Sequence, residues 1–307
     1  MILCCGDTLI DMLPRLSVAG EPAFAPYVGG ALFNSAIALG RLGAPAGLLT
    51  GLSSDFFGQM LGAALAESHV DTRFAHISDR PTTLAFVRLV DGHASYTFFD
   101  ENSAGRMLYE SDLPELDGSV EAMLFGCMTL IAEPCGSTYE ALMRRERENR
   151  VMMLDPNIRG DFVPDKAAHM ARMRRMIGLA DIVKLSDEDL AWFGETGAEA
   201  EIAGRWLAMG PKLVAITHGA KGAKGYTERF EVSVPAPIVA VADTVGAGDT
   251  FNAGILASLS RMGLLSKEGV AGLTKKDVTE ALTFAARIAS VTVSRAGANP
   301  PWARELA

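Results

Sequence analysis

The stretch that decides the fold lies near the C-terminal end of the chain and reads Ala242-Asp243-Thr244-Val245-Gly246-Ala247-Gly248-Asp249-Thr250-Phe251. Small residues at 246–248 leave the backbone exposed, and an acid follows them at once. Apolar Phe251, Ile255 and Leu259 then recur every four positions, which predicts one face of a helix. The first N–H groups of a helix lack internal partners and lie at the positive end of its dipole, so they attract anions. The stretch therefore predicts a turn that opens into a helix and can hold a phosphate.

Asp249 lies directly beside this predicted phosphate site. A carboxylate repels a phosphate, so binding the phosphate is not its role. A base that takes a proton from an attacking hydroxyl group is one chemistry that needs a carboxylate there. The alternative is a glycine-rich loop in which Asp249 only complements the helix dipole. The local residues leave both interpretations open.

Composition and charge restrict the classes of partner. The chain has 307 residues, of which 49% are hydrophobic, and a formal net charge of −9. The hydrophobic share predicts a large buried core. The negative charge argues against nucleic acid or an anionic membrane surface as the main partner, and no apolar run reaches the ~18 residues that a membrane span needs. We therefore expect a small-molecule ligand, with no nucleic acid and no membrane as partner.

The cysteines and the first residues bear on the cellular compartment. Cys4, Cys5, Cys127 and Cys135 show no C-x-x-C spacing and lie mostly in apolar surroundings, which favours reduced thiols over a zinc site or disulfides. The first residues lack the basic segment of a signal peptide. Both observations predict a cytoplasmic protein.

Strand-like apolar runs alternate with helical patterns along most of the chain. The predicted strands are residues 2–5, 46–50, 122–125, 151–154, 182–185 and 213–217. The predicted helices are residues 31–42, 56–68, 135–149, 166–178, 199–209 and 275–293. This alternation predicts a single α/β domain over residues 1–307, with a mostly parallel central sheet flanked by helices on both faces. Ligands of such sheets bind beyond the carboxyl ends of the strands.

The run Asp-Thr-Val-Gly-Ala-Gly-Asp-Thr-Phe at 243–251 resembles the C-terminal signature of the ribokinase-like (PfkB) family of sugar kinases. The resemblance implies a ribokinase-like fold, ATP as the phosphate donor and Mg²⁺ as a cofactor. It implies that Asp249 is the catalytic base and that the amides of Gly246, Ala247 and Gly248 form an anion hole. The G-x-x-x-x-G-K-[ST] motif of the P-loop fold does not occur in the sequence.

One region departs from the alternation of strands and helices. Residues 83–90 and 93–99 are β-rich and are separated by Asp91-Gly92, a strong hairpin signal. Residues 15–28 are irregular, contain proline and have no helical period. Together these segments predict a small β-sheet lid formed discontinuously by about 12–28 and 82–100. A lid would exclude water from the transferred phosphoryl group, and a plain surface hairpin is the alternative.

Two motifs point to a sugar site. Asp11 follows the first strand, and carboxylates accept paired hydrogen bonds from vicinal hydroxyl groups. Gly29 and Gly30 allow close backbone approach, and Asn34 offers a donor and an acceptor one turn into the next helix. These residues resemble the family's N-terminal signature, in which they contact the sugar. Leu32 stands where fructokinase-like members usually carry proline.

The run Asp155-Pro156-Asn157-Ile158-Arg159 follows another predicted strand. Asp-Pro-Asn is an ordinary turn sequence and needs no function. A cation beside a transferring phosphate stabilises its charge, so Arg159 is a candidate catalytic residue. A similar run lines the active site of fructokinase-like and keto-deoxygluconate-kinase-like relatives.

Two further loops resemble the family's nucleotide site. Lys184-Leu185-Ser186-Asp187-Glu188-Asp189 occupies the place of an Asn-x-x-Glu motif, which implies that Lys184 and Ser186 contact the nucleotide and that Glu188 or Asp189 organises Mg²⁺ indirectly. A capping box between Ser186 and Asp189 explains the same spacing. The second loop resembles the family's Thr-x-Gly-x-x-Gly, which implies nucleotide contacts from Thr217, Gly219 and Gly222; a simple hairpin is the alternative.

The loop after the predicted last helix contains Gly297. In the family this loop and the first acid of the signature, here Asp243, hold a potassium ion. The resemblance thus implies a K⁺ site at Asp243 and Gly297.

Together, these motifs and their resemblance to the family predict ATP-dependent phosphorylation of a sugar's primary hydroxyl group. Fructose is the first choice, and 2-keto-3-deoxygluconate, ribose and a nucleoside stay open, since lid residues that select the sugar are variable. A non-catalytic sugar or nucleotide sensor on the same fold is the alternative from another class. An exposed apolar face on the lid would allow a homodimer.

Overall fold

The predicted apolar runs form the strands of one central sheet. The computed structural model describes residues 1–90 and 93–306. The strands of this sheet are β1 (Ile2–Cys5), β4 (Ala46–Leu49), β6 (Val70–Asp71), β10 (Ala122–Gly126), β11 (Val151–Asp155), β12 (Ile182–Ser186), β13 (Leu213–Thr217), β14 (Ala223–Tyr226) and β15 (Glu231–Val234). All six predicted strands are present, and their ends agree with the prediction to within one residue.

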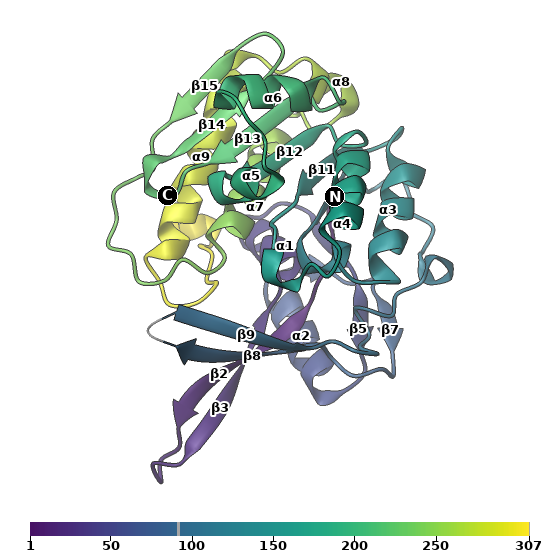
Figure 1. Cartoon of the computed structure of the whole chain (residues 1–307), viewed down its shortest axis with the longest axis vertical. Helices are drawn as coiled ribbons and strands as arrows, with labels where there is room; N and C mark the ends of the chain where they lie inside the picture. The colour runs from purple at the N-terminus through teal and green to yellow at the C-terminus, as the bar shows by residue number, and fades with distance from the viewer. Residues whose placement is uncertain (91–92, 307) are drawn as a thin grey trace.

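The strand order within the described residues is β15-β14-β13-β12-β11-β10-β1-β4-β6 (Figure 1). The pairs from β13 to β6 are parallel, and only the β13–β14 and β14–β15 pairs are antiparallel. The parallel strands are almost wholly buried, as expected for a sheet covered on both faces. Their carboxyl ends therefore share one edge, and the residues that follow them are brought together there.

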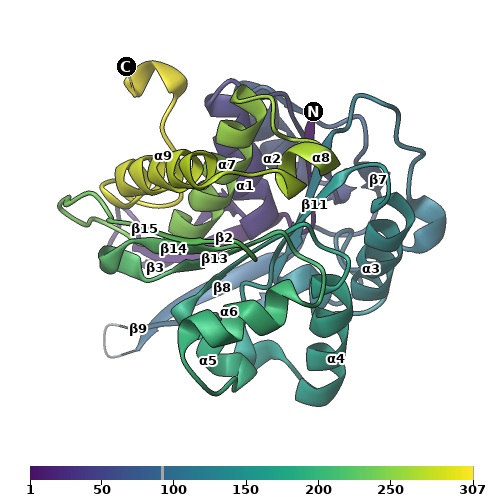
Figure 2. The ribbon, with the colours of Figure 1, turned by 90° about the horizontal axis from the view of Figure 1, so that it is seen from above.

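Helices cover both faces of the sheet (Figure 2). One face carries α1 (Ala31–Arg41), α2 (Phe56–Glu67), α7 (Ala247–Arg261), α8 (Lys267–Ala271) and α9 (Lys275–Val293), and the other carries α3 (Cys135–Glu146), α4 (Lys166–Ile177), α5 (Asp187–Phe193) and α6 (Glu199–Leu207). Successive residues of each strand point to opposite faces. Ile2 and Cys4 accordingly pack in the first core, and Leu3 and Cys5 pack in the second. The predicted α/β class is confirmed.

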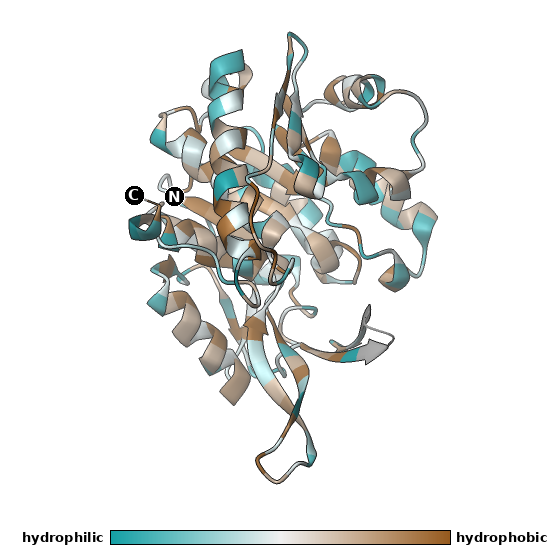
Figure 3. Cartoon of the chain, turned by 90° about the vertical axis from the view of Figure 1, so that its left-hand side faces the viewer, coloured by the Kyte–Doolittle hydropathy of each residue, from teal (hydrophilic) through white to brown (hydrophobic). Residues whose placement is uncertain are grey.

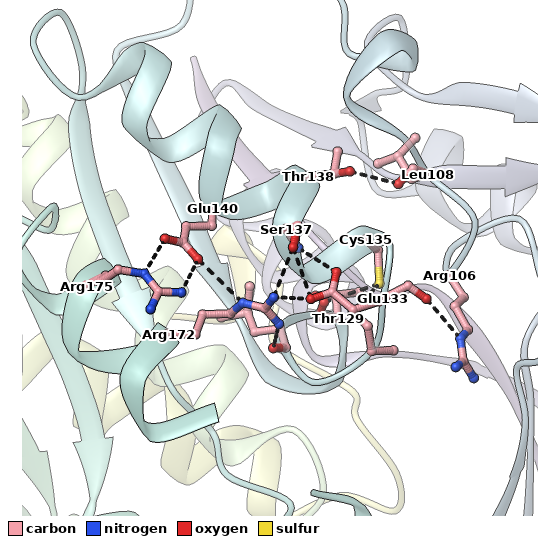
Figure 4. Close-up of polar contacts among 12 residues, drawn as sticks. Arg106, Leu108, Thr129, Glu133, Cys135, Ser137, Thr138, Glu140, Arg172 and Arg175 are labelled. Carbon is pink, nitrogen blue, oxygen red and sulfur yellow. Dashed lines mark hydrogen bonds and ion pairs between the residues drawn. The ribbon is translucent and has the colours of Figure 1, made fainter. Parts of the chain in front are cut away.

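Ion pairs join two helices on the second face (Figure 4). Glu140 of α3 is buried and accepts hydrogen bonds from Nε and Nη2 of Arg175 of α4, at 2.7 and 2.9 Å. Arg172 of α4 donates to the Leu130 carbonyl at 2.9 Å and pairs with Glu133. These contacts fix α3 against α4, well away from the start of α7.

A second sheet of four strands projects from the central body (Figure 1). It contains β2 (Leu9–Leu16), β3 (Pro22–Gly29), β8 (Leu84–Val90) and β9 (His93–Phe99) in the order β3-β2-β8-β9. The predicted turn at Asp91-Gly92 lies outside the described residues, and the strands on either side of it pair antiparallel. A separate short pair, β5 (Gly51–Ser53) with β7 (His76–Ser78), lies nearby.

The segment 15–28, irregular in its sequence pattern but expected to join a small β-sheet, makes up most of the antiparallel hairpin of β2 and β3 in that sheet. The prolines in this segment disrupt the alternating pattern by which strands are recognised in a sequence. Pro22 and Pro26 lie on β3, an edge strand, where proline is tolerated. Pro14 lies beyond Met12, the last residue of β2 that pairs with β8. The sheet also begins earlier than expected, at Leu9.

In the part of the chain that the structure describes, every helix is too short or too polar to cross a bilayer.

Close packing of α7 against α9 predicts the effect of a larger residue at Gly254. A Cβ atom there would lie 2.5 Å from the Ala285 Cα and 2.9 Å from the Ala285 Cβ, so the helices must separate. We expect Gly254→Val to lower the free energy of unfolding by about 1–3 kcal/mol, measured by urea denaturation. The control is Gly204→Ala on α6, where nothing lies within 4 Å; it should raise stability by up to about 1 kcal/mol. Equal stability of the Gly254 variant and the wild type would contradict this packing argument.

Candidate active site

A cavity of about 340 Å³ lies at the carboxyl edge of the central sheet, between that edge and the four-stranded sheet. Its walls come from both sheets and from the starts of α1 and α7: they are formed by Asp7, Leu9, Asp11, Gly30, Ala31, Asn34, Tyr96, Phe98, Cys127, Met128, Asn157, Arg159, Phe162 and residues 244–249. A pocket in this place is typical of parallel α/β sheets. It contains three predicted groups of site residues, from the C-terminal signature, the sugar motifs and the Arg159 turn.

Asp249 lies in the first turn of α7, directly after the glycine-rich turn. Gly246 caps the helix with a φ of 77°, a left-handed conformation that favours glycine. A Cβ atom on Gly246 would also lie 2.7 Å from the Ala298 Cβ. The predicted turn-to-helix junction is therefore present, with the first N–H groups of α7 at the cavity.

Two residues of α1 hold Asp249 in place. The Asn34 amide donates to Asp249 Oδ2 at 2.9 Å, and the Ser35 hydroxyl donates to the Asp249 carbonyl at 3.1 Å. Asp249 is only 7% exposed. Burial raises its pKa to about 7; the hydrogen bond from Asn34 and the charge of Lys184 oppose this rise, and the charges of Asp155 and Asp7 add to it. A carboxyl group with this pKa is suited to accept a proton near neutral pH.

The glycine pair brings the backbone against two acids. A Cβ on Gly29 would lie 2.5 Å from Asp11 Oδ2, and one on Gly30 would lie 2.6 Å from the Asp7 carbonyl. Asp7 accepts from the N–H groups of Ala31 and Leu32 at 3.0 and 3.2 Å, so it caps α1 from another segment. Asp11 makes no such cap and faces the cavity; burial and the charge of Asp7 raise its pKa to about 6.

The turn after β11 divides its polar residues between the cavity and the interior. Asn157 has a left-handed φ of 40°, and its N–H group donates to Asp155 Oδ1 at 3.2 Å. Arg159 lines the cavity together with Asn157. Asp155 points inward instead, where its Oδ2 accepts from Lys184 Nζ at 3.0 Å and from the Asn252 amide at 2.6 Å.

The acids of the predicted magnesium loop have different surroundings. Asp189 and Ser186 form the capping box foreseen as the structural alternative, with Asp189 Oδ2 accepting from the Ser186 N–H at 2.9 Å. Asp189 Oδ1 accepts from the Ile158 N–H at 2.7 Å, so both oxygens have partners. Glu188 is exposed. Neither acid is among the residues that line the cavity.

The predicted nucleotide loop forms the connection between β13 and β14. Gly219 and Gly222 have left-handed φ values of 53° and 100°. A Cβ on Gly222 would lie 2.0 Å from the Val234 carbonyl, so the fold itself requires this glycine. Thr217 ends β13 and donates to the Leu185 carbonyl at 3.4 Å. These residues lie at the carboxyl edge, outside the cavity walls.

The two residues of the predicted potassium site do meet. The Gly297 N–H group donates to Asp243 Oδ2 at 2.9 Å, and the Val245 N–H group donates to Oδ1 at 3.1 Å. The loop after α9 therefore lies against the start of the signature.

Sequence reasoning missed the aromatic wall of the cavity. Tyr96 and Phe98 lie two positions apart on β9 and both face the cavity. Their period-two spacing within a recognised strand was the available signal. It also missed the Asp155–Lys184–Asn252 contact, for which the sequence has no local signal, because three separate elements supply it.

A buried acid beside a glycine-rich turn at a helix start, at the carboxyl edge of a parallel α/β sheet, is typical of a phosphotransferase that acts on a hydroxyl group. Residues 1–304 match the family model described as pfkB family carbohydrate kinase, and the chain belongs to that family. The predicted family and ribokinase-like fold are confirmed.

Three similar proteins illustrate the likeness. A fructokinase of Rhizobium leguminosarum bv. trifolii is 56% identical over 276 residues, which cover 90% of this chain and 85% of that protein. The crystal structure of a Xylella fastidiosa fructokinase with bound ATP has a TM-score of 0.86 at 29% identity, covering 97% of this chain and 93% of that one. The crystal structure of a Vibrio cholerae fructokinase in its fructose-, ADP- and calcium-bound form has a TM-score of 0.83 at 27% identity. The match covers 97% of this chain and 94% of that one.

The raised pKa of Asp249 predicts a stability gain on neutralising it. The folded state holds the proton more tightly than the unfolded state, whose pKa is near 3.8, so ionisation costs folding free energy as the pH rises from about 4 to 7. Asp249→Asn removes this cost. Urea unfolding should show a stability gain over wild type that is about 2 kcal/mol larger at pH 8 than at pH 5.5.

The exposed variant Glu188→Gln is the control and should show no such dependence on pH. A stability difference between Asp249→Asn and wild type that is equal at both pH values, or that becomes less favourable to the variant at pH 8, would contradict the raised pKa.

Proposed function

We propose that this chain transfers the γ-phosphate of ATP to the primary hydroxyl group of fructose. The observation that carries the proposal is the position of Asp249, buried at the start of α7 beside residues 246–248, which line the cavity. The choice of fructose is supported by the 56% identity to the Rhizobium fructokinase and by the fructose bound in the Vibrio structure.

In the proposed reaction Asp249 accepts the proton of the sugar hydroxyl group while the oxygen of that hydroxyl group attacks the γ-phosphorus. The new O–P bond forms in line with the bond to the leaving ADP, which breaks. The amides of Gly246, Ala247 and Gly248, with the guanidinium of Arg159, stabilise the charge that spreads over the phosphoryl oxygens. Tyr96 and Phe98 exclude water from the cavity.

The sugar would bind to Asp11, Asn34 and the backbone of Gly29 and Gly30. Asp11 supplies a carboxylate for paired hydroxyl groups. The Asn34 amide already donates to Asp249, so in this role it would link the sugar to the base. The four-stranded sheet acts as the lid, with residues 12–28 and 82–100 as its proposed extent in a single kinase domain over 1–307.

The nucleotide would lie along Ser186, Thr217, Gly219 and Gly222, with Lys184 beneath the anion hole. The Xylella structure contains ATP and thus supports a nucleotide site in this fold. The exposed apolar side chains of Ile238, Val239 and Val241 suit an aromatic base.

Mg²⁺ is the proposed cofactor, and the donor set fits an indirect site. Both Asp189 oxygens bond to protein groups, whereas the Glu188 side chain is exposed, so Glu188 would act through water and Asp189 would fix the loop. Bound Mg²⁺ would offset phosphate charge. A K⁺ site in the loop after α9 is also proposed, on the ground that Asp243 and Gly297 lie in contact there.

We place the reaction in the cytoplasm. The four cysteines are free and buried, which suits a reducing compartment, and ATP is the donor.

A sugar panel tests the substrate. We expect kcat/KM for fructose to exceed that for ribose, a nucleoside and 2-keto-3-deoxygluconate by at least about tenfold, as one lost polar contact removes about 1.4 kcal/mol. The sugar acid should react worst, because Asp7, Asp11 and Asp249 outnumber Arg159 around the cavity. A coupled assay of ADP release measures the rates, and Asp249→Asn should lose at least about 100-fold in kcat.

Sugar binding by calorimetry without ADP formation from any sugar would instead favour the sensor. Near-normal turnover by Asp249→Asn would overturn the proposed base.

A homodimer through the lid is a further part of the proposal. The lid face turned away from the cavity carries Phe24, Phe86 and Phe99 in edge-to-face contact, with ring centroids 5.0 and 5.4 Å apart. Phe24 and Phe99 are 45% and 59% exposed, and apolar stretches run along this sheet (Figure 3). An exposed apolar face of this kind is typical of an interaction surface.

Light scattering on the purified chain tests the dimer. The wild type should have the mass of two chains, and Phe99→Asp should have that of one, because a buried unpaired charge opposes association. Met209→Asp, at an exposed apolar residue beyond α6, is the control and should stay dimeric. A monomeric wild type would contradict the proposal.

A further inference from the structure

Three buried polar side chains form a cluster below the start of α7. Lys184 of β12, Asp155 of β11 and Asn252 of α7 are only 4%, 3% and 2% exposed. Asp155 Oδ2 accepts from Lys184 Nζ at 3.0 Å and from the Asn252 amide at 2.6 Å. The cluster therefore joins two strands of the central sheet to the helix that carries Asp249.

The ammonium group of Lys184 lies against the anion hole. A Cβ atom built on Gly248 would be 3.0 Å from Lys184 Nζ, and no other atom outside the helix lies within 4 Å of it. Nζ thus lies against the backbone of Gly248, which lines the cavity, whereas Lys184 itself is not among the lining residues. A phosphate on the amides of the turn would have this positive charge behind it.

The same cluster adjoins the base. A small cavity of about 10 Å³ is bounded by Asp155, Asn252 and Asp249, together with Ser35 and Asn157. The Asn252 Oδ1 atom is buried beside it without a hydrogen-bond partner among the described residues. Asp249 therefore lies near both members of the ion pair, the negative carboxylate of Asp155 and the positive ammonium group of Lys184.

The charge of Lys184 is retained despite its burial. Burial alone would lower the pKa of Lys184, but the carboxylates of Asp155 and Asp189 raise it above its ordinary value. Asp249, Arg159 and Asp7 are further charged groups around this region. Because water is excluded, a charge a few ångströms away acts far more strongly than it would at the surface.

We propose that the Lys184–Asp155–Asn252 cluster is a positioning element for phosphoryl transfer, in which Lys184 acts through the Gly248 backbone on the transferred group. This inference rests on the proposed kinase function. It assigns Lys184 a place behind the loop, in the protein interior, and not a direct contact with the nucleotide. Asp155 holds the ammonium group, and Asn252 holds Asp155 to α7.

Four variants of the full chain test the proposal. Lys184→Met removes the charge behind the loop, and Asp155→Asn removes its partner with little change of shape. The double variant removes both charges. Lys267→Met is the matched control, because Lys267 pairs with Asp181 at 2.7 Å at the opposite end of β12. Each is assayed with ATP and fructose for kcat, both KM values and the dependence of kcat on pH.

We expect kcat of Lys184→Met to fall by about 10- to 100-fold, somewhat less than for loss of a direct oxyanion donor. Both KM values should change by less than about threefold, since an interaction made mainly in the transition state affects kcat. The acid limb of the wild-type profile should lie near pH 7, the pKa of Asp249. It should move to higher pH in Lys184→Met and to lower pH in Asp155→Asn, because opposite charges are removed.

The double variant separates this role from a purely structural one. If the pair only holds the fold, the double variant should recover the wild-type kcat, as replacement of a buried pair by neutral groups is often tolerated; that result would overturn the proposal. An increase confined to KM for ATP would also overturn it, because Lys184 would then be a nucleotide ligand. So would unchanged kcat and pH profiles, or an equal loss of kcat in Lys267→Met.

Failure of the proposed function has a different signature. In that case the wild type itself would release no ADP with fructose, whereas failure of this inference requires an active wild type.

Discussion

The arrangement of this molecule depends on the burial of one carboxyl group at the first turn of α7. Taking an acid out of water is unfavourable unless polar groups surround it. The chain provides those groups from α1, where Asn34 and Ser35 bond to Asp249 at 2.9 and 3.1 Å. The crossing of α1 and α7 is therefore fixed by chemistry as well as by packing. Gly254 allows α7 to approach α9 on its other side.

The electrostatics around that acid are divided between two layers. Facing the cavity are Asp11, Arg159 and the amides of the glycine turn, which are placed to contact ligands. Behind the turn are Lys184 and Asp155, which are too deeply buried to do so. Charges in the second layer are paired, so the cavity gains their field without a net burial of charge. The site is thus organised before any ligand arrives.

Much of the fold could be predicted from the sequence, because parallel strands buried on both faces are continuous apolar runs. Strand β1, Ile2–Cys5, is an example, and its bounds were predicted without error. Residues 12–28 were expected to join a small β-sheet, but the bounds of β2 and β3 could not be predicted. Pro14, Pro22 and Pro26 disrupt the alternating pattern and are tolerated because of how the strands pair. The residues of the C-terminal signature were found because adjacent positions form one turn. The pairing of Lys184 with Asp155 depends on the order of strands, which local sequence does not encode.

Asp189 illustrates a different limit. Its spacing from Ser186 suited both a metal loop and a helix cap, and only the positions of the Ser186 and Ile158 N–H groups distinguish the two. The family resemblance alone gives the acid a role, whereas its contacts show that both oxygens are occupied within the protein.

The pleat of the four-stranded sheet has a consequence for how such enzymes diversify. On β9, Tyr96 and Phe98 face the cavity, whereas Phe99 lies on the opposite face. Residues that are adjacent in the sequence of β9 therefore belong to two separate surfaces. Substitutions at Tyr96 or Phe98 change the cavity wall and leave the outer face unchanged, and substitutions at Phe99 do the reverse. The two roles proposed for this sheet, in substrate choice and in subunit association, therefore fall on different side chains of one short strand.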